Sequence, residues 1–171
     1  LYKSQNIKHF GNYVGCGTCQ LITADGGFDF SIDFNKQEQL SYKLIFCEIV
    51  CALSVQKKGG NFVCKIFDTF MIPTVKLLFF LGCFYEEIYL NKPLTSRPAN
   101  SEKYIVAKNF KGIDKEYLST LLELLNLWKD RDIFDVIGID LPEYFLRNIN
   151  DYNKMNSKQQ MDTINNTIKI I

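Results

Sequence analysis

The stretch Leu21-Ile-Thr-Ala-Asp-Gly-Gly27 is a short apolar run that stops at a carboxylate and two glycines. A buried parallel strand ends in this way at the working edge of an α/β sheet. Gly59-Gly-Asn-Phe-Val-Cys-Lys65 brings a lysine to the end of a second apolar strand, and Arg97-Pro-Ala-Asn-Ser-Glu102 brings a glutamate to the start of a third. We therefore expect an aspartate, a lysine and a glutamate to meet at one sheet edge.

Hydrophobic spacing and turn residues predict the elements around these stops. The helix from residue 36 has Asn35 as its N-cap and Gly59 and Gly60 at its C-cap. The connection between the last two strands is too short for a helical crossover, so these strands should pair antiparallel. The predicted elements, by residue range, are helix 6–14, strand 20–24, loop 26–35, helix 36–58, strand 61–67, a short helix from Pro73, strands 86–90 and 104–108, an amphipathic helix 116–129 containing Trp128, and, after Pro142, another helix with a polar tail.

This order predicts an α/β fold with a Rossmann-like sheet, mostly parallel and closed by an antiparallel final hairpin. The chain begins at Leu1, and its first strand already ends at residue 24. A sheet that opens in this way is expected to be the C-terminal part of a longer domain, truncated on its N-terminal side.

Composition places the chain among globular proteins without a strong charge bias. It has 171 residues, of which 47% are hydrophobic, and this suits one globular domain or most of one. The 20 Lys and Arg residues are balanced by 19 Asp and Glu residues, so any basic groove for nucleic acid has to be local. The longest apolar run, residues 77–84, is too short to span a bilayer, and no membrane partner is expected.

The cysteine pattern argues against metal and disulfide chemistry. Six cysteines are scattered through apolar segments with no signal peptide before them, so free buried thiols in a reducing compartment are expected. Cys16 and Cys19 form a CxxC pair, but no second pair follows at zinc-ribbon spacing and His9 is the sole histidine. We therefore expect no structural metal.

Three segments of the sequence closely resemble a known enzyme family. They are Ala24-Asp-Gly-Gly-Phe28, Gly59-Gly-Asn-Phe-Val-Cys-Lys-Ile-Phe-Asp68 and Lys92-Pro-Leu-Thr-Ser-Arg-Pro-Ala-Asn-Ser-Glu-Lys-Tyr104. The chain resembles the FtsJ-like RNA 2′-O-ribose methyltransferases, and within them the cap-specific mRNA 2′-O-methyltransferases of eukaryotes and large DNA viruses. The resemblance covers residues 20 to 110. It implies a methyltransferase sheet, S-adenosyl-L-methionine as methyl donor and capped mRNA as substrate.

The resemblance also implies roles for individual residues. The family uses a Lys-Asp-Lys-Glu tetrad, in which Asp25, Lys65 and Glu102 match the last three members. The resemblance places the first lysine and the main donor-binding loop upstream of this chain. Asp25 is therefore the residue of this chain that is expected to contact the donor. Matching positions imply RNA contacts, with phosphate contact reasonable for lysines and arginine in the loops at this edge. The resemblance implies RNA contacts for Asn35, Lys36, Gln37 and Asn100, and Arg97 is expected to join them. For Lys36, Lys92 and Arg97, which lie in loops at this edge, simple surface solvation is about as reasonable as phosphate contact.

The chemistry explains why such residues are needed. A ribose 2′-hydroxyl is a poor nucleophile at neutral pH, so the site must orient it and accept its proton. A lysine at its ordinary pKa is charged, and only the neutral amine can accept a proton. Following the family, Lys65 is expected to be the base, while Asp25 and Glu102 orient the lysines. Of the phenylalanines in the 26–35 loop, Phe28 and Phe34 are expected to pack on the core rather than stack on a base.

Several readings remain open from the sequence. The leading one is methylation of the first transcribed nucleotide of capped mRNA. The alternatives are a ribosomal or transfer RNA 2′-O-methyltransferase, or a non-catalytic RNA-binding remnant without the donor-binding half. We expect residues 1–111 to form the C-terminal portion of the methyltransferase domain and residues 112–171 a helical extension. A cellular version would act in the nucleus, and a viral one in cytoplasmic factories or the virion.

Overall fold

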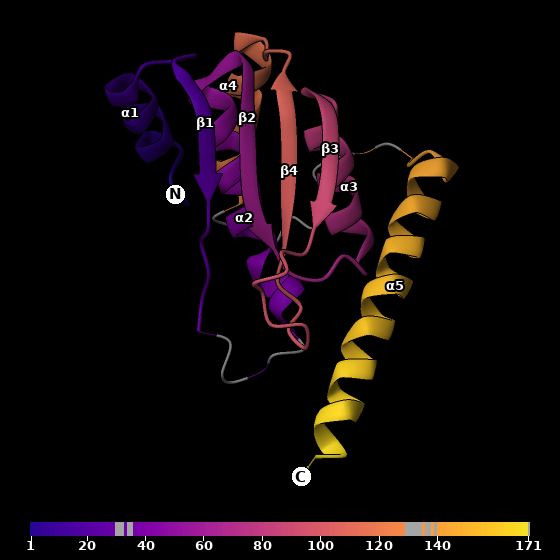
Figure 1. Ribbon diagram of the computed structural model, residues 1–171. Helices are drawn as coiled ribbons and strands as arrows, with labels where there is room; N and C mark the ends of the chain where they lie inside the picture. The colour runs from indigo at the N-terminus through magenta and orange to yellow at the C-terminus, as the bar shows by residue number, and fades with distance from the viewer. Residues whose placement is uncertain (30–32, 34–35, 129–134, 136–137, 139, 171) are drawn as a thin grey trace.

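The computed structural model describes residues 1–29, 33, 36–128, 135, 138 and 140–170 (Figure 1). Helices and strands alternate along the first part of the chain, and two further helices follow the last strand. The elements are α1 (Ser4–Val14), β1 (Cys19–Ala24), α2 (Gln37–Val55), β2 (Gln56–Ile66), α3 (Ile72–Gly82), β3 (Tyr85–Asn91), β4 (Lys103–Phe110), α4 (Lys115–Leu127) and α5 (Glu143–Ile168).

The four strands form one sheet in the order β1-β2-β4-β3. β1 and β2 pair in parallel, whereas β4 runs antiparallel to both of its neighbours, β2 and β3. β1, β2 and β3 therefore point the same way and only β4 is reversed, as the arrows in Figure 1 show. The predicted α/β sheet with an antiparallel final pair is confirmed.

Helices cover one face of this sheet. α2 packs against β1 and β2, α3 packs against β3, and both lie behind the sheet in Figure 1. Burial along β2 alternates accordingly: Phe62, Cys64 and Ile66 are completely buried, whereas Val63 and Lys65 between them are only partly buried. The strand thus turns its apolar side chains to the core and Lys65 to the opposite face.

α2 is the central helix of the core and is buried on most of its sides. It contacts the sheet, α1, α3 and α4. The Trp128 ring at the end of α4 lies 5.3 Å from the ring of Phe46 and 5.7 Å from that of Tyr42 on α2. A helix enclosed in this way is apolar all round, which explains why α2 is rich in apolar residues on every face.

The predicted end of this helix was wrong. α2 stops at Val55 and β2 begins at Gln56, so Gly59 and Gly60 lie inside a strand rather than at a helix C-cap. The Gln56 side chain donates hydrogen bonds to the carbonyls of Cys19 and Asn61, at 3.1 and 3.2 Å. The pairing register shifts here, and Gly59 has a φ of 78°, which a glycine adopts without strain. The glycines therefore accommodate a bulge.

Other predicted boundaries shift as well. α4 ends at Leu127, so Trp128 follows the helix as its C-cap, and α5 continues to Ile168 where a polar tail was expected. α4 contributes Leu121, Leu122 and Leu125 to the same core as the sheet. The division of the chain after residue 111 stays a prediction.

The six cysteines are free, but only Cys47 and Cys64 are buried, so the expectation of buried thiols holds for two of them. Within the described ranges, no three His, Cys, Asp or Glu side chains are placed to share a metal ion. Among the described helices, none is both long enough and apolar enough to cross a bilayer.

Candidate active site

Asp25 and Lys65 meet where two neighbouring strands end. β1 and β2 pair in parallel, with Ala24 opposite Cys64, so the residues that follow lie side by side. Lys65 Nζ lies 2.8 Å from Asp25 Oδ1 and donates a further hydrogen bond to the Asp25 carbonyl at 3.1 Å. The lysine side chain is 14% exposed and the aspartate side chain 69%. The amine is therefore shielded, while the carboxylate that holds it faces outward.

Glu102 joins this pair through Tyr104, a residue that the sequence analysis did not assign to the site. Tyr104 is paired with Lys65 across the antiparallel ladder, so both side chains lie on the same face of the sheet. The Tyr104 hydroxyl donates to Glu102 Oε1 at 3.1 Å. Burial, reinforced by the adjacent Glu102 carboxylate, raises the pKa of Tyr104 to about 12. The hydroxyl therefore stays protonated at neutral pH and acts as a fixed donor.

A buried carboxylate on α2 holds the backbone beneath the ion pair. Glu48 is only 6% exposed; its Oε1 accepts from the Gly26 N–H at 3.0 Å, and its Oε2 accepts from Cys64 Sγ at 3.5 Å. Gly26 follows Asp25 in the sequence, and Cys64 precedes Lys65. Burial raises the pKa of Glu48, although the Gly26 hydrogen bond opposes the shift. The Glu48 carboxylate thus accepts hydrogen bonds from residues next to both members of the ion pair, one at the end of β1 and one near the end of β2.

Glycine at residue 26 leaves room for the Glu48 carboxylate. A Cβ atom built there would lie 2.4 Å from Glu48 Oε1 and 3.0 Å from Leu44 Cδ2, so the Glu48 side chain would have to move away from the turn. The carboxylate can approach the turn only because Gly26 has no side chain. A glutamate inside the apolar run Phe46-Cys-Glu-Ile-Val50 was the sequence signal that should have drawn attention to residue 48.

A second lysine shapes the loop between β3 and β4. Lys92 Nζ donates to the Asn100 carbonyl at 2.8 Å, to Asn100 Oδ1 at 2.7 Å and to the Glu102 carbonyl at 2.9 Å. Burial, with the nearby Lys103 ammonium, lowers the pKa of Lys92. The ammonium is engaged within the protein, so the role that this structure gives Lys92 is to order the loop, not the phosphate contact that its loop position suggested.

Lys103 fixes the same loop from the buried side of the sheet. It is 2% exposed, and its Nζ lies 2.9 Å from Asp68 Oδ1 and 3.1 Å from the Ser101 carbonyl. Lys103 pairs with Ile66 at the end of β2, so its ion pair ties the exit of β2 to the entry of β4. Alternate residues of a strand face opposite sides, which separates Lys103 from Glu102 and Tyr104.

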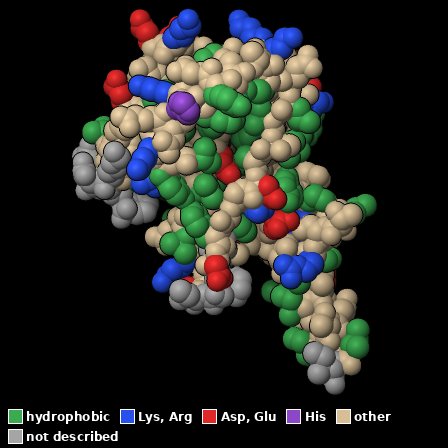
Figure 2. All heavy atoms as spheres, turned by 90° about the vertical axis from the view of Figure 1, so that its left-hand side faces the viewer, with side chains coloured by type: hydrophobic (Ala, Val, Ile, Leu, Met, Phe, Trp, Pro, Cys, Tyr) green, Lys and Arg blue, Asp and Glu red, His purple; other side chains and the backbone are tan. Residues whose placement is uncertain are grey.

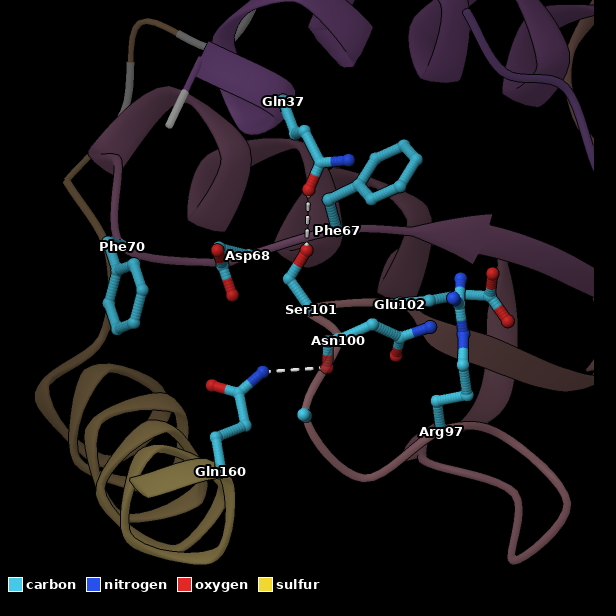
Figure 3. A pocket seen from close by; sticks show the side chains of 10 residues that line it. Gln37, Phe67, Asp68, Phe70, Arg97, Asn100, Ser101, Glu102 and Gln160 are labelled. Carbon is cyan, nitrogen blue, oxygen red and sulfur yellow. Dashed lines mark hydrogen bonds between the residues drawn. The ribbon is translucent and has the colours of Figure 1, made fainter. Parts of the chain in front are cut away.

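The loop borders a pocket of about 690 Å³, whose lining side chains are drawn in Figure 3. Its lining includes four of the residues predicted for the site: Gln37, Arg97, Asn100 and Glu102. Gln37 Oε1 accepts from the Ser101 hydroxyl at 2.8 Å, which connects the start of α2 to the loop. The remaining lining residues are Phe67, Asp68, Phe70, Ala99, Ser101 and Gln160.

Other predicted residues do not join this pocket. Lys36 is not among the lining residues, and its Nζ forms an ion pair with Asp33 at 3.2 Å. Asn35 and Phe34 lie outside the described residues. Asn35 was the predicted N-cap of α2, but Lys36 occupies that position. Phe28 is described and contradicts the expectation of core packing, because it is 45% exposed and stacks on Tyr2 with ring centroids 6.5 Å apart.

A second pocket, of about 470 Å³, lies along the outer edge of β1. Apolar side chains gather on this face of the molecule, which Figure 2 shows. Phe10 of α1, Leu21 of β1 and Val55 of α2 contribute to its lining, and Asp25 and Glu48 bring carboxylates to it. Asp25 lines this pocket and Glu102 lines the other, so the series Asp25, Lys65, Tyr104 and Glu102 connects the two.

Comparison with known proteins gives consistent matches. Residues 2–110 match the model of the FtsJ-like methyltransferase family. The chain is 41% identical over 148 residues to cap-specific mRNA (nucleoside-2′-O-)-methyltransferase 1 of Danio rerio, covering 81% of this chain and 18% of the relative. The Mus musculus protein of that name is 45% identical over 131 residues, covering 72% and 16%. Methyltransferase 1A of Caenorhabditis briggsae is 34% identical over 171 residues, covering 91% and 20%. The chain thus spans about a fifth of the length of these curated relatives.

Proposed function

The chain belongs to the FtsJ-like methyltransferase family, and we propose that it takes part in 2′-O-ribose methylation of the first transcribed nucleotide of capped mRNA. The relatives carry cap-specific mRNA methyltransferase in their names. The observation that carries the proposal is the Lys65–Asp25 ion pair, in which Asp25 lines the smaller pocket, together with Glu102, which lines the larger one. A methyl transfer needs such an arrangement, with one pocket for the donor and one for the acceptor.

The residues along β1 fit part of S-adenosyl-L-methionine, the donor that this family generally uses. Their pocket is lined mostly by apolar side chains, which suit the hydrocarbon and ring portions of the donor, and the Asp25 carboxylate suits the positive charge of its sulfonium. When bound, the donor supplies an activated methyl group. Asp25 would then serve both as its contact and as the anchor of Lys65.

Lys65 is the proposed proton acceptor. The ion pair with Asp25 fixes the direction of the Lys65 side chain, and a neutral amine held there would be able to accept the proton of the ribose hydroxyl. The hydroxyl proton passes to Nζ as the 2′-oxygen bonds to the methyl carbon. The bond between that carbon and the donor's sulfur breaks, and the rest of the donor would leave as a neutral thioether. The Tyr104 hydroxyl donates to one oxygen of Glu102. The Glu102 carboxylate also lines the larger pocket, from which it would orient the ribose.

The larger pocket is proposed to take the RNA. Arg97 offers a positive charge for a phosphate, and Gln37 and Asn100 offer amide groups for sugar or base edges. Lys92 and Ser101 hold the Asn100 loop and Gln37 in place through the hydrogen bonds described above. The RNA site is thereby preorganised, which lowers the entropic cost of binding.

Methyl transfer from labelled S-adenosyl-L-methionine tests the proposal. The full-length protein is given short capped and uncapped RNAs and a ribosomal RNA fragment, with Lys65→Ala as the site variant. Lys57→Ala, an exposed lysine at the other end of β2, is the matched control. Labelling that requires the cap, and that falls about 100-fold or more in Lys65→Ala alone, is the expected result.

Three other results would change the proposal. Labelling of the ribosomal fragment in preference to capped RNA would favour the alternative substrate class. A folded protein that labels none of the RNAs, yet binds them, would be an RNA-binding relative without activity. Equal labelling by Lys65→Ala and the unsubstituted protein would remove Lys65 from the reaction.

A further inference from the structure

Helix α5 lies outside residues 2–110, which match the family model. It nevertheless borders the larger pocket, the one proposed to take the RNA. Figure 1 shows α5 running beside the sheet, with its C-terminal end extending below it. Among the buried and partly buried residues of the helix, Ile149, Asn153, Asn156 and Gln160 follow one another at helical spacing. This series defines the face of α5 that is turned to the protein.

The chemistry of that face changes along the helix. Near its start it is apolar, where Phe145 packs edge-to-face on Phe79 at 5.2 Å and Ile149 enters the core. From Asn153 onward the face carries amides, and Asn153 and Asn156 are 8% and 4% exposed. Side-chain amides are seldom buried, because each must find hydrogen-bond partners inside the protein. The change occurs where the helix leaves α3 and reaches the pocket.

Asn153 fixes the helix to the segment between β2 and α3. Its Oδ1 accepts from the Thr69 hydroxyl at 2.6 Å, and its Nδ2 donates to the Thr69 carbonyl at 2.8 Å. Both residues are buried. A two-bond contact of this kind sets the rotation of α5 about its axis, and therefore which side chain faces the pocket two turns later.

Gln160 is that side chain. Its Nε2 donates to the Asn100 carbonyl at 2.6 Å, and Lys92 donates to the same oxygen. Figure 3 shows Gln160 approaching Asn100 from α5, across the pocket from Gln37 and Ser101. Phe70, which is 61% exposed, lies on the same side and offers the face of an aromatic ring.

We propose that α5 is the outer wall of the RNA pocket and that Gln160 is a positioning residue that fixes Asn100 for contact with an RNA nucleotide. This inference rests on the proposed function. The Nε2 bond holds the loop, and the Oε1 of the same amide is available to accept from a base or a 2′-hydroxyl. Phe70 supplies a stacking surface for the base, and Arg97 faces its phosphate. α5 therefore affects RNA affinity and leaves donor binding unchanged.

The test compares Gln160→Met and Gln160→Glu with the unsubstituted full-length protein. Methionine keeps the length of the side chain but removes the donor, whereas glutamate removes the donor and places a negative charge against the Asn100 carbonyl. Gln159→Met, at an exposed position on the same helix, is the matched control. Fluorescence anisotropy measures binding of a short capped RNA, and steady-state methyl transfer gives kcat and separate KM values for RNA and for S-adenosyl-L-methionine.

We expect Gln160→Met to weaken RNA binding and raise the RNA KM by about fivefold, the equivalent of one ordinary hydrogen bond. Gln160→Glu should be weaker still, while the donor KM and kcat stay within about twofold and Gln159→Met resembles the unsubstituted protein. Unchanged RNA binding in both Gln160 variants, in a protein that methylates capped RNA, would overturn this inference alone. Equal losses for RNA and donor would reduce Gln160 to a structural role, and an unsubstituted protein that binds no RNA would overturn the proposed function itself.

Discussion

Replacing Glu48 tests whether the Asp25–Lys65 ion pair depends on the buried carboxylate beneath it. In Glu48→Leu the side chain keeps most of its bulk but loses both acceptor oxygens. The Gly26 N–H, now bonded at 3.0 Å, and the Cys64 thiol then lose their partner. In Glu48→Gln one oxygen remains to accept from Gly26. The pair of variants separates loss of the hydrogen bond from loss of the charge.

Two opposing effects set the change in the free energy of unfolding. Loss of a hydrogen bond to a charged acceptor lowers it by about 1.5–3 kcal/mol, whereas removing the desolvation cost of a buried carboxylate offsets part of that loss. Gly26 is only partly buried, so water can replace some of the lost bond. We therefore expect Glu48→Leu to lower the free energy of unfolding by about 1–2 kcal/mol and Glu48→Gln by less than about 1 kcal/mol.

Urea unfolding and methyl transfer provide the two readouts. Because Gly26 adjoins Asp25, a loosened turn should lower kcat in Glu48→Leu more than it raises either KM. Glu123→Leu, an exposed glutamate on α4, is the control and should change stability by no more than about 0.5 kcal/mol. A Glu48→Leu protein that matched the unsubstituted one in both stability and kcat would refute the reasoning.

Four further outcomes follow from the same contacts. Burial places the folded-state pKa of Glu48 above its ordinary value of 4.5, so the unfolded chain loses the proton first; stability should fall as pH rises from about 4.5 through the raised pKa, and chemical unfolding of Glu48→Gln should lack that slope. Gly26→Ala should cost about 1–3 kcal/mol in thermal or urea unfolding, because its Cβ would lie 2.4 Å from Glu48 Oε1. Tyr104→Phe should lower kcat by about tenfold while changing stability by less than about 1 kcal/mol, since it removes only the donor to Glu102; unchanged kinetics would exclude that contact from catalysis. Lys103→Met should destabilise by about 2–4 kcal/mol in urea, because it leaves Asp68 and a loop carbonyl unpaired, and a neutral effect would mean that the pair is not needed for the fold.

The meeting of Asp25 and Lys65 was predictable because it depends on local signals. Each residue ends an apolar run, and parallel neighbours bring such ends to the same edge. The end of α2 was not predictable in the same way. Gln56, Lys57 and Lys58 have good helix propensity, but Gln56 pairs with Cys19 of β1 and the strand begins there. Tertiary pairing overrode the local preference.

Residues that act across the fold were missed for a related reason. Tyr104 faces Lys65 because β4 enters the sheet beside β2, and the sequence does not state which strand β4 will join. Gln160 reaches Asn100 only because Asn153 and Thr69 set the helix, and these contacts join distant parts of the chain. Spacing along the chain carries no information about such pairings.

The reversed strand β4 also has a consequence for how the site forms. β4 lies between β2 and β3, so β3 emerges first but gains its place in the sheet only after β4 has paired with β2. That pairing joins residues that are about 40 apart in the sequence, as does the pairing of β1 with β2, so each closes a loop of similar length. The same event brings Tyr104 opposite Lys65 and Glu102 to the edge. A chain that has not yet completed β4 therefore lacks Tyr104 and Glu102 beside Asp25 and Lys65, and the proposed active site is complete only when the last strand is in place.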